Sequence, residues 1–191
     1  MAIAEVNAHI FGCEETKEVM LIDAGKFDLA IDHFVTSNDL KLTTIFITHD
    51  HGDHVAGVEE CARHFGAQVI AGTESPGGYP ADRVVKHGDE IQIGLITGKV
   101  VSTPGHTPVA LSLIFPGMVF SGDALFAGSV GGTASTENFD LQHRQVQDHL
   151  LSLPGDYQVH SGHGPATTIG DERVVNPFLV NPRLTLGIDL D

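Results

Sequence analysis

A group of histidines and aspartates directly follows a short apolar segment. Residues 42–47 are rich in β-branched side chains and predict a strand, and residues from 55 onward predict a helix. Three histidines and two aspartates fall within six residues between them, in the segment Thr48-His49-Asp50-His51-Gly52-Asp53-His54. Imidazole nitrogens and carboxylate oxygens are the ligands that zinc, manganese and iron take in proteins. The segment therefore predicts a metal site where a strand ends.

The spacing within this segment predicts two metal positions rather than one. His49 and His51 alternate, so their side chains point the same way on an extended backbone. Asp53 and His54 are adjacent, so their side chains must diverge. One short turn can thus supply ligands to two ions.

Three further candidate ligands lie where other predicted strands end in turns. His106 follows a β-branched segment in a Pro-Gly turn, Asp123 follows a predicted hairpin, and His163 lies between two glycines after another strand. The two oxygens of Asp123 can bridge two metal ions. His160 is the competitor of His163, and we favour His163 because its flanking glycines leave the imidazole free to project at the turn.

Asp23 lies where the predicted strand at residues 18–22 ends in a glycine turn. Two interpretations of Asp23 remain open on this pattern alone. Its carboxylate either caps the turn or orients a metal-binding imidazole from behind.

The central segment matches the His-x-His-x-Asp-His motif of the metallo-β-lactamase fold superfamily. The chain also resembles the small, single-domain glyoxalase II-like (hydroxyacylglutathione hydrolase-like) hydrolases of that superfamily, from residue 23 to residue 178. The later strings that carry this resemblance are Thr103-Pro104-Gly105-His106-Thr107, Ser121-Gly122-Asp123, Gly162-His163-Gly164-Pro165 and the tail around Glu172 and Arg173. We expect those last two residues to form an ion pair.

The resemblance implies a role for each candidate ligand. Two divalent metal ions, zinc most often and otherwise iron or manganese, would be held by seven residues. It assigns His49, His51 and His106 to one ion. It assigns Asp53, His54 and His163 to the other ion. Asp123 would bridge the two ions. It also favours the second interpretation of Asp23, as the carboxylate behind an imidazole.

The order of predicted elements favours an α/β (α+β) chain. Each half contains strands followed by helices, which predicts an αββα sandwich of two mixed β-sheets flanked by helices. The length of 191 residues suits one domain over residues 1–191. The main predicted helices are residues 28–38, 55–65 and 141–151, with a long loop over 124–139, and the strand pairs are 5–11 with 18–22, 91–96 with 99–103, and 110–115 with 118–120.

Charge and cysteine content restrict the partners and the compartment. The chain has 10 basic and 25 acidic residues, a formal charge of −15 that repels nucleic acid phosphates and disfavours a nuclease. No apolar run reaches the roughly 18 residues of a membrane span, and residues 1–10 are too short and mixed for a signal peptide. Cys13 and Cys61 are unclustered, which predicts free thiols in a reducing cytoplasm.

The resemblance implies hydrolysis of a small-molecule acyl substrate, most directly a glutathione thioester. A hydroxide bridging the two metals would attack the carbonyl, and one metal would stabilise the developing oxyanion. Asp53 would hold this nucleophile and take its proton. Two departures concern glutathione binding. We expect the chain to lack the C-terminal helical domain of larger glyoxalase II enzymes, and Gly131-Gly132-Thr133-Ala134 stands where the family often has Gly-Arg-Thr-Asp.

Three alternatives share this ligand set. A lactonase or β-lactamase would use both metals on another acyl group. A persulfide dioxygenase would use a single iron, and the presence of His163 disfavours it. A non-catalytic, metal-stabilised binding module is the third. The loop at residues 72–80, rich in glycine and proline, is a candidate for substrate contacts in each case.

Overall fold

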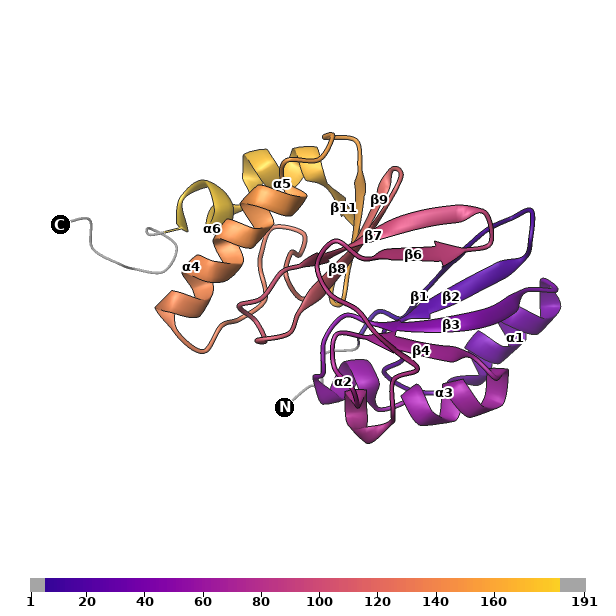
Figure 1. Ribbon diagram of the computed structural model, residues 1–191. Coiled ribbons are helices and arrows are strands. Elements are labelled where there is room, and N and C mark those ends of the chain that lie inside the picture. The colour runs from indigo at the N-terminus through magenta and orange to yellow at the C-terminus, as the bar shows by residue number, and fades with distance from the viewer. Residues whose placement is uncertain (1–5, 183–191) are drawn as a thin grey trace.

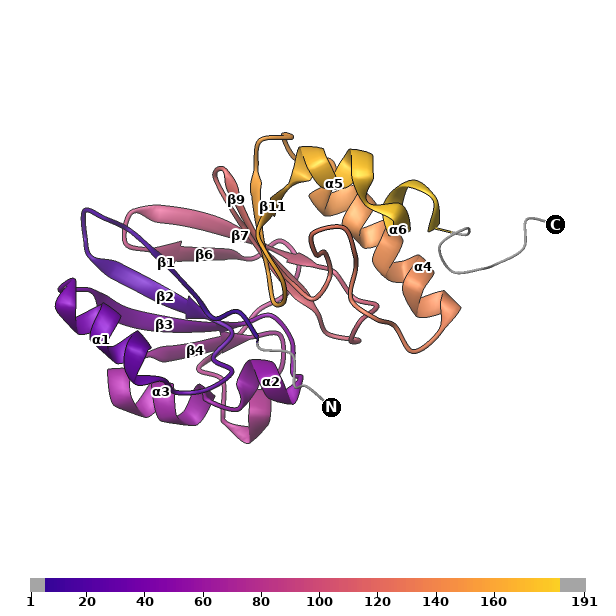
Figure 2. The same cartoon turned by 180° about the vertical axis from the view of Figure 1, so that it is seen from behind.

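The computed structural model describes residues 6–182. Two β-sheets lie face to face, and helices cover the outer face of each (Figures 1 and 2). Both sheets contain parallel and antiparallel neighbours. The predicted αββα sandwich of two mixed sheets is therefore confirmed.

The first sheet has the strand order β1-β2-β3-β4-β5. Its β1–β2 pair is antiparallel and the other pairs are parallel. The strands are β1 (His9–Gly12), β2 (Glu18–Ile22), β3 (Lys41–Ile47), β4 (Gln68–Ala71) and β5 (Arg83–Val84). The helical segments on this half are α1 (Leu29–Ser37), α2 (Gly52–Val55), α3 (Val58–Phe65) and the 3₁₀ turn η1 (Pro76–Gly78).

The second sheet has the strand order β11-β10-β9-β8-β7-β6. Only its β9–β10 pair is parallel. The strands are β6 (Glu90–Ile93), β7 (Ile96–Ser102), β8 (Leu111–Phe115), β9 (Met118–Gly122), β10 (Gln158–Ser161) and β11 (Thr167–Thr168). The helical segments are α4 (Thr136–Gln145), the π-helical turn η2 (Val146–Leu150), α5 (Ile169–Val175) and α6 (Pro177–Val180).

Strand alternation divides the apolar side chains into layers. On β3, Ile45 and Ile47 face the first group of helices, whereas Phe46 between them faces the second sheet. A third apolar cluster lies between the second sheet and its helices and includes Val119, Leu150 and Val159. The period of two along a strand thus produces both the core between the sheets and the two cores beneath the helices.

Strand direction brings several strand ends to one edge of the molecule. Because β2 and β3 are parallel, Asp23 and Thr48 emerge together after them. In the second sheet β9 and β10 are parallel, and β7 runs in the direction of β9 because β8 is antiparallel to both. At this edge the Leu111 N–H donates to the Thr48 carbonyl oxygen at 2.9 Å, which joins the two sheets.

The prediction of a single helix over residues 55–65 is wrong, because two separate helices, α2 and α3, lie in this region. The Gly57 N–H donates to the Ala24 carbonyl oxygen at 2.8 Å, and a Cβ on Gly57 would lie 2.4 Å from the Lys26 backbone. This close approach interrupts the helix. The periodicity of apolar residues carries no information about such a contact between distant segments.

The long loop predicted over residues 124–139 is shorter than expected. α4 begins at Thr136, where the Ser135 hydroxyl accepts the Asn138 N–H at 3.2 Å as an N-cap.

The two-residue strands β5 and β11 carry no periodic signal and are found only in the structure. Cys13 and Cys61 are free, as predicted, and both are buried. Within residues 6–182, every helix is too short or too polar to cross a membrane.

Phe46→Ala tests the core between the sheets. Because Phe46 is fully buried, we expect the free energy of unfolding to fall by about 3–5 kcal/mol. Phe34→Ala is the matched control, since Phe34 on α1 is half exposed, and its cost should stay below about 1 kcal/mol. Urea denaturation followed by circular dichroism measures both values. Equal losses in the two variants would contradict the assigned core.

Candidate metal centre

All seven predicted ligands lie together at the shared edge of the two sheets. Their potential ligand atoms form three overlapping groups, in each of which the atoms lie within 4.8 Å of one another. The groups are His49, His51 and His106; Asp53, His54 and His163; and His49, His54 and Asp123. The chain thus brings together residues that are more than 100 positions apart in sequence.

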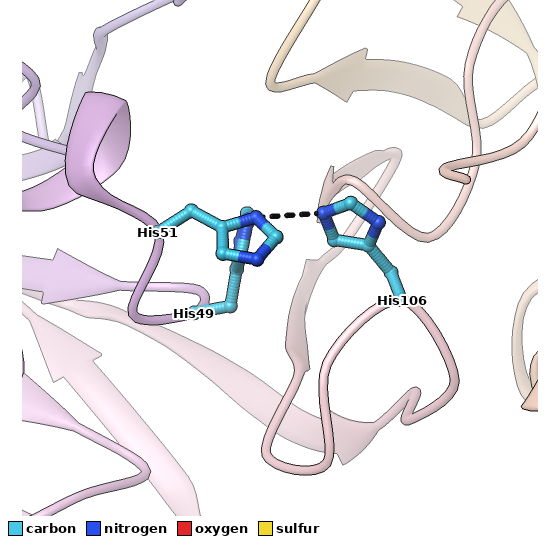
Figure 3. Close-up of side chains that lie close together, drawn as sticks. All are labelled: His49, His51 and His106. Atoms are coloured by element: carbon cyan, nitrogen blue, oxygen red, sulfur yellow. Dashed lines mark hydrogen bonds between the residues drawn. The ribbon is translucent and has the colours of Figure 1, made fainter. Parts of the chain in front are cut away.

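Three imidazole nitrogens converge in the first group. The Nδ1 atom of His51 lies 3.1 Å from His49 Nε2 and 2.9 Å from His106 Nε2. Figure 3 shows the His106 ring facing His49 and His51 from a separate loop. Nitrogens about 2.0–2.1 Å from a tetrahedral zinc ion lie about 3.3 Å from one another. The observed separations are close to that arrangement.

Asp123 lies between the first and second groups. One of its oxygens, Oδ1, is 3.4 Å from His54 Nε2, and the other, Oδ2, is 3.5 Å from both His106 Nε2 and His163 Nε2. Asp53 Oδ2 completes the second group at 3.3 Å from His163 Nε2. Oδ2 of Asp123 therefore faces one imidazole from each group, as an oxygen that bridges two ions would, whereas Oδ1 faces His54.

Two buried polar atoms at the centre make no hydrogen bond within the described chain: His54 Nε2 and Asp123 Oδ1. Burying such atoms without a partner is costly. The two atoms lie 3.4 Å from each other, and a divalent cation bound beside them would satisfy both. The residues present therefore fit a pair of metal ions with nitrogen and oxygen ligands.

Contacts behind the rings determine which nitrogen each imidazole presents. Asp23 Oδ2 accepts from His54 Nδ1 at 2.9 Å, and the Thr48 hydroxyl contacts His49 Nδ1 at 3.1 Å. The Gly132 carbonyl oxygen accepts from His106 Nδ1 at 2.6 Å. In all three rings Nδ1 is engaged, so Nε2 is left to face the centre, as in metal sites with outer hydrogen-bond partners.

Asp23 does more than cap a turn. Its carboxylate accepts the Thr48 N–H and the Thr48 hydroxyl, both at 2.8 Å, in addition to the His54 ring. Asp23 itself has a left-handed φ of 59° and is buried. A strained backbone held this way is typical of functional sites. These contacts support the interpretation of Asp23 as the carboxylate behind an imidazole.

In the absence of a bound cation, His54 and His49 differ in their pKa values. Burial alone lowers the pKa of His54, but the contacts with Asp123 and Asp23 outweigh it and raise that pKa to about 10. Burial, together with the charge on His54, lowers the pKa of His49 to about 4. His54 therefore carries a proton between two carboxylates, in the place where a cation would otherwise neutralise them.

Sequence reasoning missed two kinds of residue at the centre. A Cβ on Gly162 would lie 2.3 Å from Asp123 Oδ1 and 2.5 Å from His54 Cε1, so only glycine fits there. Asp50, between two candidate ligands, accepts the Gly77 N–H through Oδ1 at 2.6 Å. That bond fastens the loop at residues 72–80 to the metal-binding segment. In the sequence, the only indication of this tight packing was the glycine that precedes His163 in the Gly162-His163-Gly164 string.

The structure separates the other histidines from the centre. His160 packs its ring on Phe120 at a centroid distance of 5.5 Å, so His163 rather than His160 lies beside Asp53. His64 contacts the Asp32 carboxylate at 2.7 Å on the surface between α1 and α3. The choice of His163 over His160 as a metal ligand stays a prediction.

Residues 5–163 match the family model of the Metallo-beta-lactamase superfamily, which is more than half of the chain. The chain belongs to the metallo-β-lactamase superfamily. Proteins of this fold bind divalent metal ions, and the histidine and aspartate groups described above are consistent with that property. The resemblance drawn from the sequence motifs is thus confirmed at the level of the superfamily.

Individual relatives extend this comparison. A protein of Brucella ovis named hydroxyacylglutathione hydrolase is 39% identical over 141 residues, which are 70% of this chain and 52% of the relative. The chain therefore spans about half the length of the curated relatives it matches. Among solved structures, the B3 metallo-β-lactamase BLEG-1 has a TM-score of 0.86 at 29% identity, with 95% of this chain and 97% of BLEG-1 covered.

Two other solved structures are similar over most of their length. ETHE1 from Myxococcus xanthus has a TM-score of 0.80 at 28% identity and covers 92% of this chain and 80% of its own. TTHA1623, solved in a di-iron-bound form, has a TM-score of 0.73 at 29% identity and covers 94% of this chain and 98% of its own. These similarities confirm the predicted metallo-β-lactamase fold.

Asp23→Asn tests the contact behind His54. An amide at this position removes the negative charge that orients the ring, so we expect metal affinity to fall by about 10–100-fold. Asp32→Asn is the matched control, because it removes the carboxylate that contacts His64 at the surface. Competition with a chromophoric chelator measures both affinities. Similar losses in both variants would contradict the role assigned to Asp23.

Proposed function

We propose that the chain is a di-metal hydrolase that cleaves acyl thioesters of the glyoxalase II type. The observation that carries this proposal is the convergence of two ligand groups on the shared carboxylate of Asp123. His49, His51 and His106 would hold one ion and Asp53, His54 and His163 the other. Zinc suits this mixed set, and iron or manganese would also be accepted.

A pair of bound divalent cations would supply Lewis acidity and a lowered pKa for a nucleophilic water. The protein's own contribution is to hold the substrate and the proton. Asp53 is the most exposed carboxylate of the centre, with a side chain that is 37% exposed. Its side chain therefore borders solvent, while its Oδ2 lies 4.0 Å from His54 Nε2 and 3.3 Å from His163 Nε2. In this position the carboxylate accepts the proton released as water attacks the carbonyl.

The substrate class follows from the relatives rather than from the centre. The curated relatives are named hydroxyacylglutathione hydrolase, which favours a glutathione thioester. We propose that the loop at residues 72–80, which is fastened to the metal segment through Asp50 and Gly77, contacts that substrate. A β-lactam is the second candidate, because the BLEG-1 structure superposes over nearly all of both chains.

A substrate screen on protein of measured metal content tests the proposal. We expect two divalent ions per chain and turnover of acyl-glutathione thioesters ahead of lactones and a cephalosporin. Preferred turnover of the cephalosporin would favour the second candidate. One iron per chain, with oxygen consumed in the presence of a persulfide, would identify a dioxygenase instead. Two bound ions without turnover of any substrate would indicate a binding module.

His51→Ala tests the first ligand group. Removing a ligand should cost more than removing an outer contact, so we expect kcat/KM to fall by more than about 100-fold, with loss of metal. His143→Ala is the matched control, since His143 lies on α4 beside Phe139 and away from the centre. Thioester kinetics and metal analysis on the same samples provide the readout. Comparable losses in the two variants would contradict the ligand assignment.

Gly132→Arg tests whether a basic side chain at this position strengthens binding of a glutathione carboxylate. A Cβ on Gly132 meets nothing within 4 Å, so a side chain fits there without displacing the carbonyl that holds His106. One exposed ion pair should lower KM for an acyl-glutathione thioester by about 2–5-fold. Gly132→Met and the same acyl group on an uncharged thiol are the controls. An equal change for both thioesters would exclude carboxylate recognition.

A further inference from the structure

Glu172 is a buried carboxylate that takes no direct part in the candidate metal centre. It lies on α5 and is 2% exposed. The ion pair expected with Arg173 is absent among the described residues: Arg173 donates instead to the carbonyl oxygens of Leu151 and Leu153. A buried carboxylate is costly unless donors satisfy it, so its partners indicate what it stabilises.

Glu172 accepts from two residues that flank it in the sequence and from one that lies 44 residues away. Its Oε1 accepts the Thr167 hydroxyl at 2.7 Å. Its Oε2 accepts the Gly128 N–H at 2.9 Å and the side-chain amide of Asn176 at 2.7 Å. The Asn176 amide also donates to the Ser129 carbonyl oxygen at 2.9 Å. Glu172 and Asn176 therefore hold the backbone of residues 126–129 from the side of α5.

Residues 126–129 form a small hairpin that leads into the backbone behind His106. Phe126 and Ser129 are paired as an antiparallel bridge. Three residues later, the Gly132 carbonyl oxygen accepts from His106 Nδ1 at 2.6 Å. The Gln142 side-chain amide holds the intervening Gly131 carbonyl oxygen at 3.1 Å. The position of the His106 ring thus depends on a segment whose other end is fixed by Glu172.

The same hairpin contacts the second ligand group. The Phe126 ring meets the His163 ring edge to face, with centroids 6.0 Å apart and planes at 82°. His106 and His163 belong to different candidate metal positions and both lie within 3.5 Å of Asp123 Oδ2. One hairpin therefore supports a ring from each group.

We propose that Glu172 is a positioning residue for the metal centre, acting through the hairpin at residues 126–129 on the rings of His106 and His163. This inference rests on the proposed function, because it assumes that these rings hold metal. The carboxylate touches neither metal nor substrate. Its effect is to fix the backbone carbonyl that orients one imidazole and the aromatic ring that packs on the other.

The test compares Glu172→Ala with Glu172→Gln and Arg173→Met in protein loaded with cobalt(II). Alanine leaves the Gly128 N–H without its acceptor, so the hairpin is released. Glutamine keeps an acceptor oxygen for Gly128 and Asn176 and can donate to the Thr167 hydroxyl. Arg173→Met weakens α5 through its contacts with Leu151 and Leu153 but does not touch the hairpin. Chelator competition, the visible cobalt spectrum and the melting temperature are recorded for each.

We expect Glu172→Ala to lower cobalt affinity by about 10–100-fold and to change the cobalt spectrum. Glu172→Gln should stay within about threefold of the wild type, as rescue by the conservative variant requires. Arg173→Met should lower the melting temperature while leaving affinity and spectrum unchanged. If Glu172→Ala does not fold, Glu172→Asp, which keeps the charge but shortens its reach, should show the same direction of change.

Two results would overturn the inference, and they differ in meaning. Wild-type affinity and spectrum in Glu172→Ala or Glu172→Asp, with only a lower melting temperature, would make Glu172 a purely structural residue and leave the proposed function intact. A wild-type protein that binds no cobalt would remove the proposed metal centre and the positioning role together.

Discussion

Strand direction is the constraint on which the candidate site depends. β2 and β3 end side by side in one sheet, while β7, β9 and β10 end at the same edge in the other. Polar side chains that follow these strands are delivered to one place, although the strands themselves are apolar and buried. Reversing any of these strands would move its ligand to the opposite end of the sandwich. The apolar layers thus determine where the chemistry occurs.

The polar residues behind the imidazole rings determine which nitrogen atom of each ring faces the centre. Asp23, Thr48 and the Gly132 carbonyl each engage the Nδ1 side of an imidazole, and the Nε2 atoms are left to face the centre. Gly162 leaves room for Asp123 and His54 to approach one another. Glu172 extends the same arrangement outward, to a helix that contributes no candidate ligand. Positioning is therefore distributed over both halves of the fold.

Much of this arrangement could be predicted from the sequence because its signals are local. The β-branched segment before Thr48 predicted β3, and the glycine turns around His106 and His163 marked strand ends. The missed features depend on contacts between distant segments. Gly57 divides a helix because it packs on Lys26, and Asp50 binds Gly77 across a loop. Glu172 was expected to pair with Arg173, whereas it accepts from Thr167 and Asn176 nearby in the sequence and from Gly128 in a distant segment that no local pattern connects to it.

The central claim is that this chain holds two cations between its two groups of ligands. Anomalous diffraction from crystals of the purified protein, recorded on both sides of the zinc, iron and manganese absorption edges, tests that claim most directly. The account predicts two anomalous peaks, one beside His49, His51 and His106 and one beside Asp53, His54 and His163, with Asp123 between them. A single peak, or none at this edge of the sandwich, would contradict it.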